Sequence, residues 1–305
     1  MDKDKETGFL KFAKECLKPK RHYKDELARY KTWVPPGHYY SPVPNTDRIR
    51  QREAKIWSSH APVNGVPGID LNEQAQLRLM DSMAAYYGQM PFDEKKKDGL
   101  RYYFDNPFFC HTDAIVYYSI LRHMRPKMVI EAGSGFSSAV LLDTNELFFK
   151  NSIKCSFIEP FPERLNTLLK ETDSVKLIAS GLQDVEAGLF KCLGAGDILF
   201  IDSTHVSKTD SDVNQLLFEI LPSLESGVYI HFHDIFYPFE YPKEWVYAGR
   251  AWNEAYILRA YLQYNRSFRI VFFNSYMHCF HAPEFAAKMP LCMKNTGGSL
   301  WIEKI

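Results

Sequence analysis

The segment Glu131-Ala-Gly133-Ser-Gly135-Phe-Ser137 places two glycines between an acidic residue and a pair of serines. Glycine lets the backbone turn tightly and lets a ligand approach the main chain closely. A helix expected to begin near Ser137 would present free backbone N–H groups to that ligand. The segment therefore predicts a cofactor-binding loop with Glu131, Gly133, Gly135 and Ser137 as contacts.

The residues around this loop distinguish between two classes of cofactor. A dinucleotide-binding fingerprint requires a third glycine three residues after the second, whereas position 138 is serine. Glu131 would repel a pyrophosphate, but it suits the cationic methionine part of S-adenosylmethionine. Glu159 ends the next expected strand, where a carboxylate can accept hydrogen bonds from both ribose hydroxyls. Gln183 and Asp184 follow the third strand, a place suited to polar contacts with an adenine edge.

A second set of candidates follows the fourth and fifth expected strands. Asp202 and His205 form an Asp-x-x-His pattern, and His233 is followed by Asp234. Adjacent parallel strands would bring both loops to one cleft, where carboxylates and neutral imidazoles could bind a divalent metal ion. We predict Asp202, His233 and Asp234 as metal ligands, with Asp202 also touching the cofactor. We predict Asp202 and His205 as catalytic residues, with His205 as the general base, because histidine titrates near neutrality.

Two of the histidines leave alternatives open. Alternation along a strand points residues 233 and 234 to opposite faces, so both reach one ion only if the chain turns there. Asp234 alone would otherwise be the ligand. His231 lies within an apolar strand and is expected to be a buried structural residue.

An aromatic and proline-rich loop at 235–245 follows these candidates directly. Aromatic faces suit sugar rings or planar substrates, so the loop could line an acceptor pocket; packing on the sheet edge is the alternative. Arg250 and Asn253 could anchor polar groups of the acceptor. Residues 101–104 and 106–111 are expected to cap the cleft and exclude water.

Strands and helices must position these residues, and they alternate from about residue 113 onward. The expected strands are 128–131, 155–159, 175–178, 197–202, 227–233, 268–273 and 300–303, and the expected helices are 113–123, 137–148, 163–170, 210–221 and 252–264. Alternation of this kind predicts a parallel sheet with helices on both faces, an α/β Rossmann-like doubly wound fold.

The first third of the chain has a different pattern. We expect an N-terminal cap and strap region over 1–109 and the cofactor-binding domain over 110–305. Within the cap, apolar spacing predicts helices at 8–17 and 71–87, and four prolines predict an extended strap at 33–45.

Composition restricts the possible partners and surroundings. Lys plus Arg and Asp plus Glu are 37 each, so the net charge of zero argues against a nucleic-acid partner. None of the six cysteines has Cys-x-x-Cys spacing and no secretory signal begins the sequence, which predicts reduced thiols and a cytoplasmic location. No long apolar run predicts a membrane span. A homo-oligomer is left open.

The motifs VIEAGSGFSS, FIEP and DILFIDSTH resemble those of the class I S-adenosylmethionine-dependent methyltransferases. The resemblance covers roughly residues 110–305, and it implies a seven-stranded, mostly parallel sheet whose last strand is antiparallel. The two later loops resemble the metal-dependent O-methyltransferase branch that includes macrolide-sugar methyltransferases and cephalosporin-hydroxylase-like proteins. Asp202, His205 and Asp234 match that branch, whereas His233 stands where it usually has glutamate. This departure leaves magnesium, manganese, iron or no metal open.

We therefore expect a methyltransferase that uses S-adenosylmethionine and acts on a small hydroxylated substrate, such as a sugar or another secondary metabolite. A divalent metal ion is an optional second cofactor. The alternatives are a metal- or nicotinamide-dependent oxidoreductase on the same scaffold and a non-catalytic nucleotide-binding protein. The fold by itself does not decide among them.

Overall fold

The computed structural model describes residues 32–57 and 64–305, and the chain forms two compact units, Met1–Ile56 and Trp57–Ile305. The described part of the first unit contains the short helices α3 (Thr46–Gln51) and α4 (Glu53–Ile56). Asn45 caps α3, because its side-chain oxygen accepts a hydrogen bond from the Arg48 N–H. The helix predicted over 8–17 lies outside the described residues.

The second unit is built on a seven-stranded sheet with the order β3-β2-β1-β4-β5-β7-β6. Its strands are β1 (Met128–Ala132), β2 (Lys154–Ile158), β3 (Val175–Ile178), β4 (Ile198–Ile201), β5 (Tyr229–Phe232), β6 (Phe268–Phe273) and β7 (Leu300–Lys304). β7 is antiparallel to both of its neighbours, and the pairs among β1 to β5 are parallel. The predicted Rossmann-like fold with an antiparallel last strand is confirmed.

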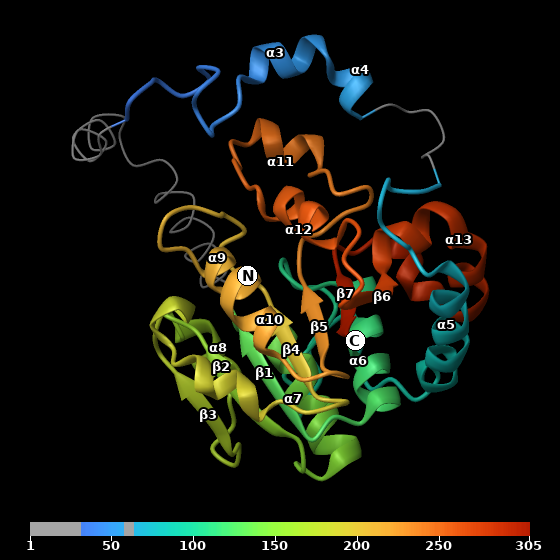
Figure 1. Ribbon diagram of the computed structural model, residues 1–305. Helices are drawn as coiled ribbons and strands as arrows, with labels where there is room; N and C mark the ends of the chain where they lie inside the picture. Colours follow the sequence, from blue (N-terminus) through green and yellow to red (C-terminus); the bar gives the residue numbers. More distant parts are fainter. Residues whose placement is uncertain (1–31, 58–63) are drawn as a thin grey trace, which may run out of the picture. The chain divides into compact units, whose positions relative to one another are not determined.

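Helices flank this sheet (Figure 1). The helices of the second unit are α5 (Glu73–Tyr87), α6 (His111–Met124), α7 (Phe136–Phe149), α8 (Glu163–Leu168), α9 (Asp212–Gln215), α10 (Leu221–Ser223), α11 (Lys243–Tyr247), α12 (Glu254–Leu262) and α13 (Asn274–Lys288). Short 3₁₀ turns lie at Leu182–Asp184, Ala187–Cys192 and Pro290–Lys294. α5, α6 and α7 pack side by side. Figure 1 shows α10 in front of β4, and α12 beyond the tip of β5.

The central strands are short runs of buried apolar residues, which a parallel sheet covered on both faces requires. Every residue of β4 is buried, and its register with β5 pairs Ile201 with Phe232 at the carboxyl end. The loops that follow β4 and β5 therefore begin side by side. This adjacency, predicted from the sequence, positions the candidate catalytic residues.

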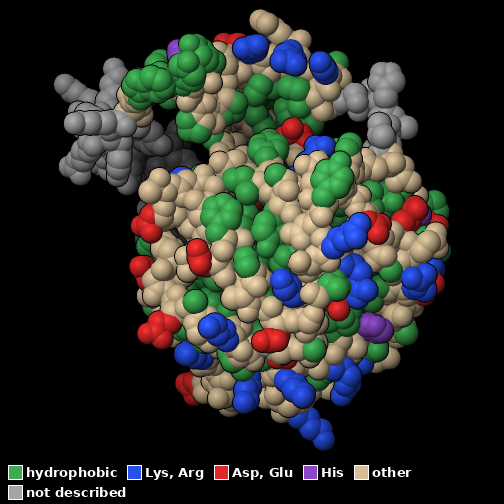
Figure 2. All heavy atoms as spheres, in the orientation of Figure 1, with side chains coloured by type: hydrophobic (Ala, Val, Ile, Leu, Met, Phe, Trp, Pro, Cys, Tyr) green, Lys and Arg blue, Asp and Glu red, His purple; other side chains and the backbone are tan. Residues whose placement is uncertain are grey.

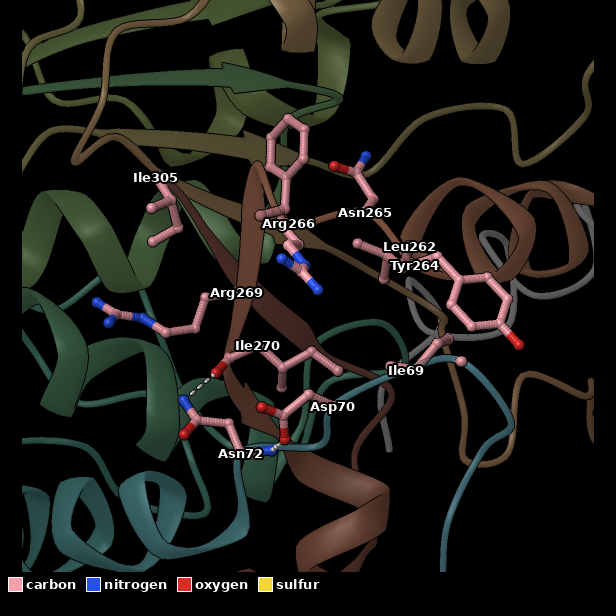
Figure 3. Close-up of a pocket in the computed structure, with 12 residues that line it drawn as sticks. Ile69, Asp70, Asn72, Leu262, Tyr264, Asn265, Arg266, Arg269, Ile270 and Ile305 are labelled. Carbon is pink, nitrogen blue, oxygen red and sulfur yellow. Dashed lines mark hydrogen bonds between the residues drawn. The ribbon is translucent and has the colours of Figure 1, made fainter.

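The free edge of the sheet is covered by side chains that precede or begin α5. The Asn72 side-chain amide donates to the Ile270 carbonyl over 2.9 Å, as Figure 3 shows, and Gln76 accepts from the Phe273 N–H over 2.8 Å. These contacts satisfy backbone groups of β6 that an edge strand otherwise leaves open to another chain. Residues 64–109 therefore contribute to the fold of the second unit.

Several helices differ from the expected ones. α11 was not predicted, and α12 covers Glu254–Leu262 rather than residues 252–264. α6 begins at His111, two residues before the predicted start, and α13 was not predicted, because Pro283 and the kink at His281 interrupt its apolar spacing. The helix predicted to stop at Pro222 continues to Ser223. The turn before this proline, Leu216–Ile220, is widened to a π-helix, which accommodates the missing N–H.

The described cysteines, Cys110, Cys155, Cys192, Cys279 and Cys292, are free thiols, as predicted. Among the described residues, no helix is both long enough and apolar enough to cross a membrane. On the face drawn in Figure 2, basic and acidic side chains are interspersed over the second unit. The cytoplasmic location and the oligomeric state stay predictions.

Candidate functional site

The loop after β1 packs directly against the loop after β4. Gly133 has a φ of +80°, and a Cβ added to it would overlap the carbonyl oxygen of Asp202. The Asp202 N–H donates to the Ala132 carbonyl over 2.8 Å, which holds the two loops together. Only glycine combines this positive φ with so close an approach, so Gly133 sets the shape of the sheet edge.

Glu131 is fully buried beneath the loop. Its Oε1 accepts hydrogen bonds from the hydroxyls of Ser137 and Ser138, the latter over 2.9 Å. Its Oε2 has no hydrogen-bond partner among the residues that the structure describes, and the same holds for the buried hydroxyl of Ser134. Burial raises the pKa of Glu131 to about 8. Two polar atoms without partners beside a glycine loop suit the amino and carboxylate groups of a bound amino acid moiety.

Glu159 joins the β1 loop to the loop after β2. Its two carboxylate oxygens accept from the backbone N–H groups of Ser134 over 3.0 Å and of Phe161 over 2.9 Å. Each oxygen keeps a lone pair for a ligand hydroxyl. Glu159 lines a cavity of about 540 Å³ together with Gly133, Gln183, Asp184 and Asp202, so five of the predicted cofactor contacts share one space.

A second cavity, of about 490 Å³, lies on the other side of Asp202. Asp202, Ser203 and Thr204 line both cavities and form their common wall. The second cavity is also lined by Gly135, Ser137, His205, His233 and Asp234, and by an outer group that consists of Pro107, Phe108, Phe109, Arg164, Trp245, Arg250 and Trp252. All of the predicted cofactor, metal and catalytic residues except the buried Glu131 thus line one of two adjoining cavities.

His205 is held from both sides of its ring. Its Nδ1 lies 2.8 Å from Oε2 of Glu254, and its Nε2 lies 3.5 Å from Oδ1 of Asp202 and 3.8 Å from Oδ2 of Asp234. The ring also packs on Trp252, with 4.3 Å between centroids. A carboxylate at Nδ1 fixes the orientation of the imidazole and leaves Nε2 facing the cavity.

The charges of this cluster depend on one another. Burial lowers the pKa of His205, but the hydrogen bonds to Asp202 and Glu254 outweigh it and raise that pKa to about 10. The pKa of Asp202 is lowered, because His233 and His205 outweigh the effect of burial. Burial raises the pKa of Asp234. His205 is therefore protonated at neutral pH in the free protein.

The side chains of His233 and Asp234 lie close together, although regular strand alternation would point them to opposite faces of the sheet. Asp234 has a φ of +58°, so the chain turns where the sequence analysis required a turn. Nε2 of His233 then lies 3.4 Å from Oδ1 of Asp234. His231 is fully buried, stacks on Phe200 and contacts the Ser299 hydroxyl over 2.8 Å, which agrees with a structural role.

The predicted metal site has little support from these positions. Among residues 32–57 and 64–305, no three His, Cys, Asp or Glu side chains are arranged to hold an ion. The carboxylates of Asp202 and Asp234 instead face the Nε2 atoms of His205 and His233 as ion pairs. The arrangement of Asp202, His205, His233 and Asp234 is more typical of groups that share protons than of ligands around one metal ion. The metal site stays a prediction.

The aromatic loop after β5 divides into a buried and a cavity-lining part. Tyr237, Phe239 and Tyr241 are buried, and the first two pack against Phe273. This part of the loop therefore packs on the sheet, which was the alternative to lining an acceptor pocket. Trp245 lines the cavity. Asn253 does not face an acceptor, because its side chain accepts from the Ser207 N–H over 2.6 Å and donates to the Ser207 carbonyl.

The predicted capping segment also divides. Arg101 is buried in an ion-pair cluster with Asp143, Glu146 and Asp173, which anchors this part of the segment to the core. Residues 107–109 line the second cavity and can restrict access of water to it.

The sequence analysis missed Glu254 and Trp252. Glu254 stands in the first turn of α12, where acidic residues are common, so its type gave no separate signal. The N–H groups of Asn253 and Glu254 donate to the His205 carbonyl over 3.0 and 3.1 Å, which brings the start of α12 to the site. Asp212, also missed, accepts from Thr204 N–H and hydroxyl groups and holds the shared wall in place.

A sheet of this order, with an acidic residue next to last in β1, another directly after β2 and a glycine loop after β1, defines the Rossmann-like fold of the methyltransferases. Comparison with known proteins agrees. Residues 130–235 match the family model described as "Methyltransferase domain". An uncharacterized protein of Archaeoglobus fulgidus is 36% identical over 187 residues, which are 59% of this chain and 84% of that protein.

Solved structures that resemble the chain are more distant. The SAH-bound methyltransferase PaMTH1 of Podospora anserina is 14% identical, with a TM-score of 0.43, and the match covers 90% of this chain and all of that one. The plantazolicin methyltransferase BamL, solved with a triazolic desmethylPZN analog and SAH, is 15% identical, with a TM-score of 0.41 and coverage of 77% and 99%. These likenesses are too low to carry an argument about the site. The family match does carry the identification: the chain belongs to the S-adenosylmethionine-dependent methyltransferases.

Proposed function

We propose that this methyltransferase methylates a hydroxyl oxygen of a small acceptor, such as a sugar or comparable metabolite, and that His205 removes the hydroxyl proton. The observation that carries the proposal is the position of His205. Its Nε2 faces Asp202, a residue of the wall between the two cavities, while Glu254 holds its Nδ1. A base at this wall stands where cofactor and acceptor would meet.

The first cavity is the proposed cofactor site. Bound S-adenosylmethionine would supply an electrophilic methyl group on a sulfonium. Glu159 would accept the ribose hydroxyls, and Gln183 and Asp184 would contact the adenine edge. Glu131, through its unpartnered Oε2, would attract the methionine amino group. Gly133 and Asp202 would complete the contacts in this cavity, and the methionine end would reach Gly135 and Ser137, which line the adjoining second cavity.

The second cavity is the proposed acceptor site. His205 must lose its proton before it can accept one, and it does so more readily beside a positive charge, because like charges disfavour the protonated form. Asp202 and Asp234 would then orient the hydroxyl toward the base. Methyl transfer is an in-line displacement, so positioning supplies much of the rate. Residues 107–109 would exclude water that competes for the same position.

The proposed proton transfer uses protein groups alone, since the carboxylates of Asp202 and Asp234 pair with histidines. Metal assistance through Asp202, His233 and Asp234 is the second possibility from the sequence, and a chelator separates the two. An oxidoreductase would bind NADH, whose fluorescence provides the contrasting measurement.

Calorimetry with S-adenosylhomocysteine tests the cofactor site, and release of S-adenosylhomocysteine from S-adenosylmethionine tests transfer to hydroxylated probes such as glucose and 3,4-dihydroxybenzyl alcohol. We expect micromolar binding in wild type and in His205→Gln, with transfer lost only in the variant. Absence of binding by the wild type would overturn the proposal. If His205→Gln transfers methyl groups as fast as the wild type, His205 is not the base, and the assignment of the cofactor site is unaffected.

A further inference from the structure

Arg250 lines the second cavity and contacts two indole rings, Trp245 and Trp252, whose planes meet at 80°. Its guanidinium carbon is 4.1 Å from the Trp245 ring centroid and 4.8 Å from that of Trp252. Its backbone N–H donates to the Trp245 carbonyl over 3.1 Å, which closes the loop after α11. Contact with aromatic rings restricts the orientation of a guanidinium, and its N–H groups can still donate to a ligand.

Within the part of the chain that the structure describes, this guanidinium has no acidic partner. Among the described residues, the ion pairs of arginine side chains include Arg101 with Asp143 and Arg269 with Glu303, but none includes Arg250. A cation that is already oriented and has no carboxylate within ion-pair distance is typical of a site that binds oxyanions, since planar guanidinium matches carboxylate and phosphate geometry.

The contacts place Arg250 at the acceptor end of the cavity. Trp252 touches both Arg250 and the ring of His205, so the guanidinium and the proposed base share one indole as a wall. The residues that line the first cavity do not include Arg250. A molecule whose hydroxyl lies beside His205 would therefore extend past Trp252 toward Arg250.

A second arginine lines the same cavity at its other end. Arg164 stacks on Phe108 at 3.8 Å, and its Cδ would lie 3.2 Å from a Cβ added to Gly135. Arg164 is thus close to the glycine loop, where the methionine carboxylate of the cofactor would be bound. The two cations serve the two ends of the cavity, and Arg250 remains for the acceptor.

We infer that the acceptor carries an oxyanion, either a carboxylate or a phosphate, near the hydroxyl that is methylated, and that Arg250 selects for it. The inference rests on the proposed function, because the acceptor end is defined by His205 and Asp202. It narrows the substrate class from hydroxylated metabolites to hydroxy acids and sugar phosphates.

The test measures binding of matched probes to the full chain saturated with S-adenosylhomocysteine, by calorimetry at constant ionic strength. The carboxylate pair is 3,4-dihydroxybenzoate and 3,4-dihydroxybenzyl alcohol, and the phosphate pair is glucose 6-phosphate and glucose. We expect the anionic member of at least one pair to bind about 10- to 100-fold more tightly than its neutral partner, as for a charge-assisted contact. The pair that shows the preference identifies the oxyanion.

Variants assign this preference to one residue. Arg250→Gln should reduce it to less than about 2-fold, and Arg250→Lys should retain part of it, since lysine keeps the charge without the planar fork. Arg266→Gln is the matched control, because Arg266 lines a separate groove beside β6 (Figure 3) and should keep the full preference. Binding of S-adenosylhomocysteine should be the same in wild type and all three variants.

Four outcomes would overturn the inference: neither pair shows a preference for the anion, none of the probes binds the wild type, Arg250→Gln keeps the preference, or Arg250→Gln loses affinity for S-adenosylhomocysteine. The last result would assign Arg250 to the cofactor carboxylate and would leave the proposed function standing. If the wild type fails to bind S-adenosylhomocysteine, the proposed function itself is wrong, and the two failures are thereby distinguished.

Discussion

Nδ1 of His205 lies 2.8 Å from Oε2 of Glu254, a carboxylate that is almost fully buried in the first turn of α12. The contact joins the loop after β4 to a helix 49 residues further along the chain. The backbone of His205 is in the left-handed region, with a φ of +60°. The contact with Glu254 then fixes the orientation of the imidazole ring. Glu254 is a positioning residue for the proposed base.

Glu254→Gln tests this relationship. The amide keeps the size of the side chain, but it no longer holds the imidazole as a charged partner, so kcat should fall about 10²-fold or more. The affinity for S-adenosylhomocysteine should change less than about 2-fold. Glu244→Gln on the exposed side of α11 is the matched control. A pH–rate profile of Glu254→Gln identical to that of the wild type would show that Glu254 does not act through His205.

Gly133→Ala should damage the cofactor site more than the fold. The added methyl group meets the Asp202 carbonyl at a positive φ, so the two loops must separate. We expect the affinity for S-adenosylhomocysteine to fall at least about 10-fold and the melting temperature to fall by several degrees. Gly188→Ala is the control, because its methyl group enters open space. If both variants bind the ligand like the wild type, the β1 loop is not the cofactor loop.

Binding of S-adenosylmethionine should depend on pH through Glu131. Its pKa of about 8, raised by burial, means that the free protein holds this carboxyl mainly protonated at pH 7. Cationic groups of the cofactor favour the ionised form, so binding releases a proton and affinity should rise between pH 6 and 8, by at most about tenfold per pH unit. The ionisable neighbours are Tyr117, Cys155, Glu159 and Asp202.

Glu131→Gln separates this effect from other titrations. Its affinity for S-adenosylmethionine should be nearly constant from pH 6 to 8, as measured by calorimetry in buffers of different ionisation enthalpy. The wild type should release protons on binding, whereas the variant should not. The same shift affects folding: the unfolded carboxyl ionises near 4.5, so the wild type should lose stability as pH rises from 4.5 toward 8. A variant that is as pH-sensitive as the wild type would contradict the assignment.

Arg101→Met should destabilise the second unit strongly. The variant leaves Asp143 buried without its cation, and removing one partner of a buried ion pair costs about 3–5 kcal/mol. Thermal unfolding should occur about 6–15 °C lower. Arg78→Met on the exposed face of α5 should change the melting temperature by no more than about 2 °C. A small effect in Arg101→Met would show that the cluster is solvated.

Removal of metal ions should leave turnover unchanged within about 2-fold, because the acids near His205 are paired with histidines. The measurement is methyl transfer after dialysis against a chelator, with and without added magnesium, manganese or iron. Restoration of lost activity by one of these ions would favour the coordination set that was predicted from the sequence.

Much of the fold was predictable because the sheet depends on short-range patterns. Short, mostly apolar segments define β1, β2 and β4, and an acidic residue is adjacent to the last residue of each segment, at Glu131, Glu159 and Asp202. α13 was missed because Pro283 and a non-helical residue divide its apolar spacing. Short motifs whose residue types are required by the local backbone can be recognised from the sequence. A helix whose apolar spacing is interrupted depends on tertiary packing and cannot.

The site was predictable only where its residues follow strands directly. Asp202, His233 and Asp234 could be placed together because β4 and β5 are parallel neighbours. Glu254 approaches through the start of a helix, and no local pattern encodes its contact with His205. Arg250 was named from the sequence as a possible acceptor anchor, but its contacts with Trp245 and Trp252 depend on the folded chain. The raised pKa of His205 could not be predicted from the sequence either. It depends on the distances of His205 to the carboxylates of Asp202 and Glu254, which only the folded chain defines.

Asp202, Ser203 and Thr204 form a wall common to the two cavities, and this has a kinetic consequence. We expect a ligand in the first cavity to complete the surface that this wall offers to the second ligand. Turnover should then follow a compulsory order, with the nucleoside entering first and its demethylated product leaving last. S-adenosylhomocysteine would compete with S-adenosylmethionine alone and would act as a brake whenever it accumulates.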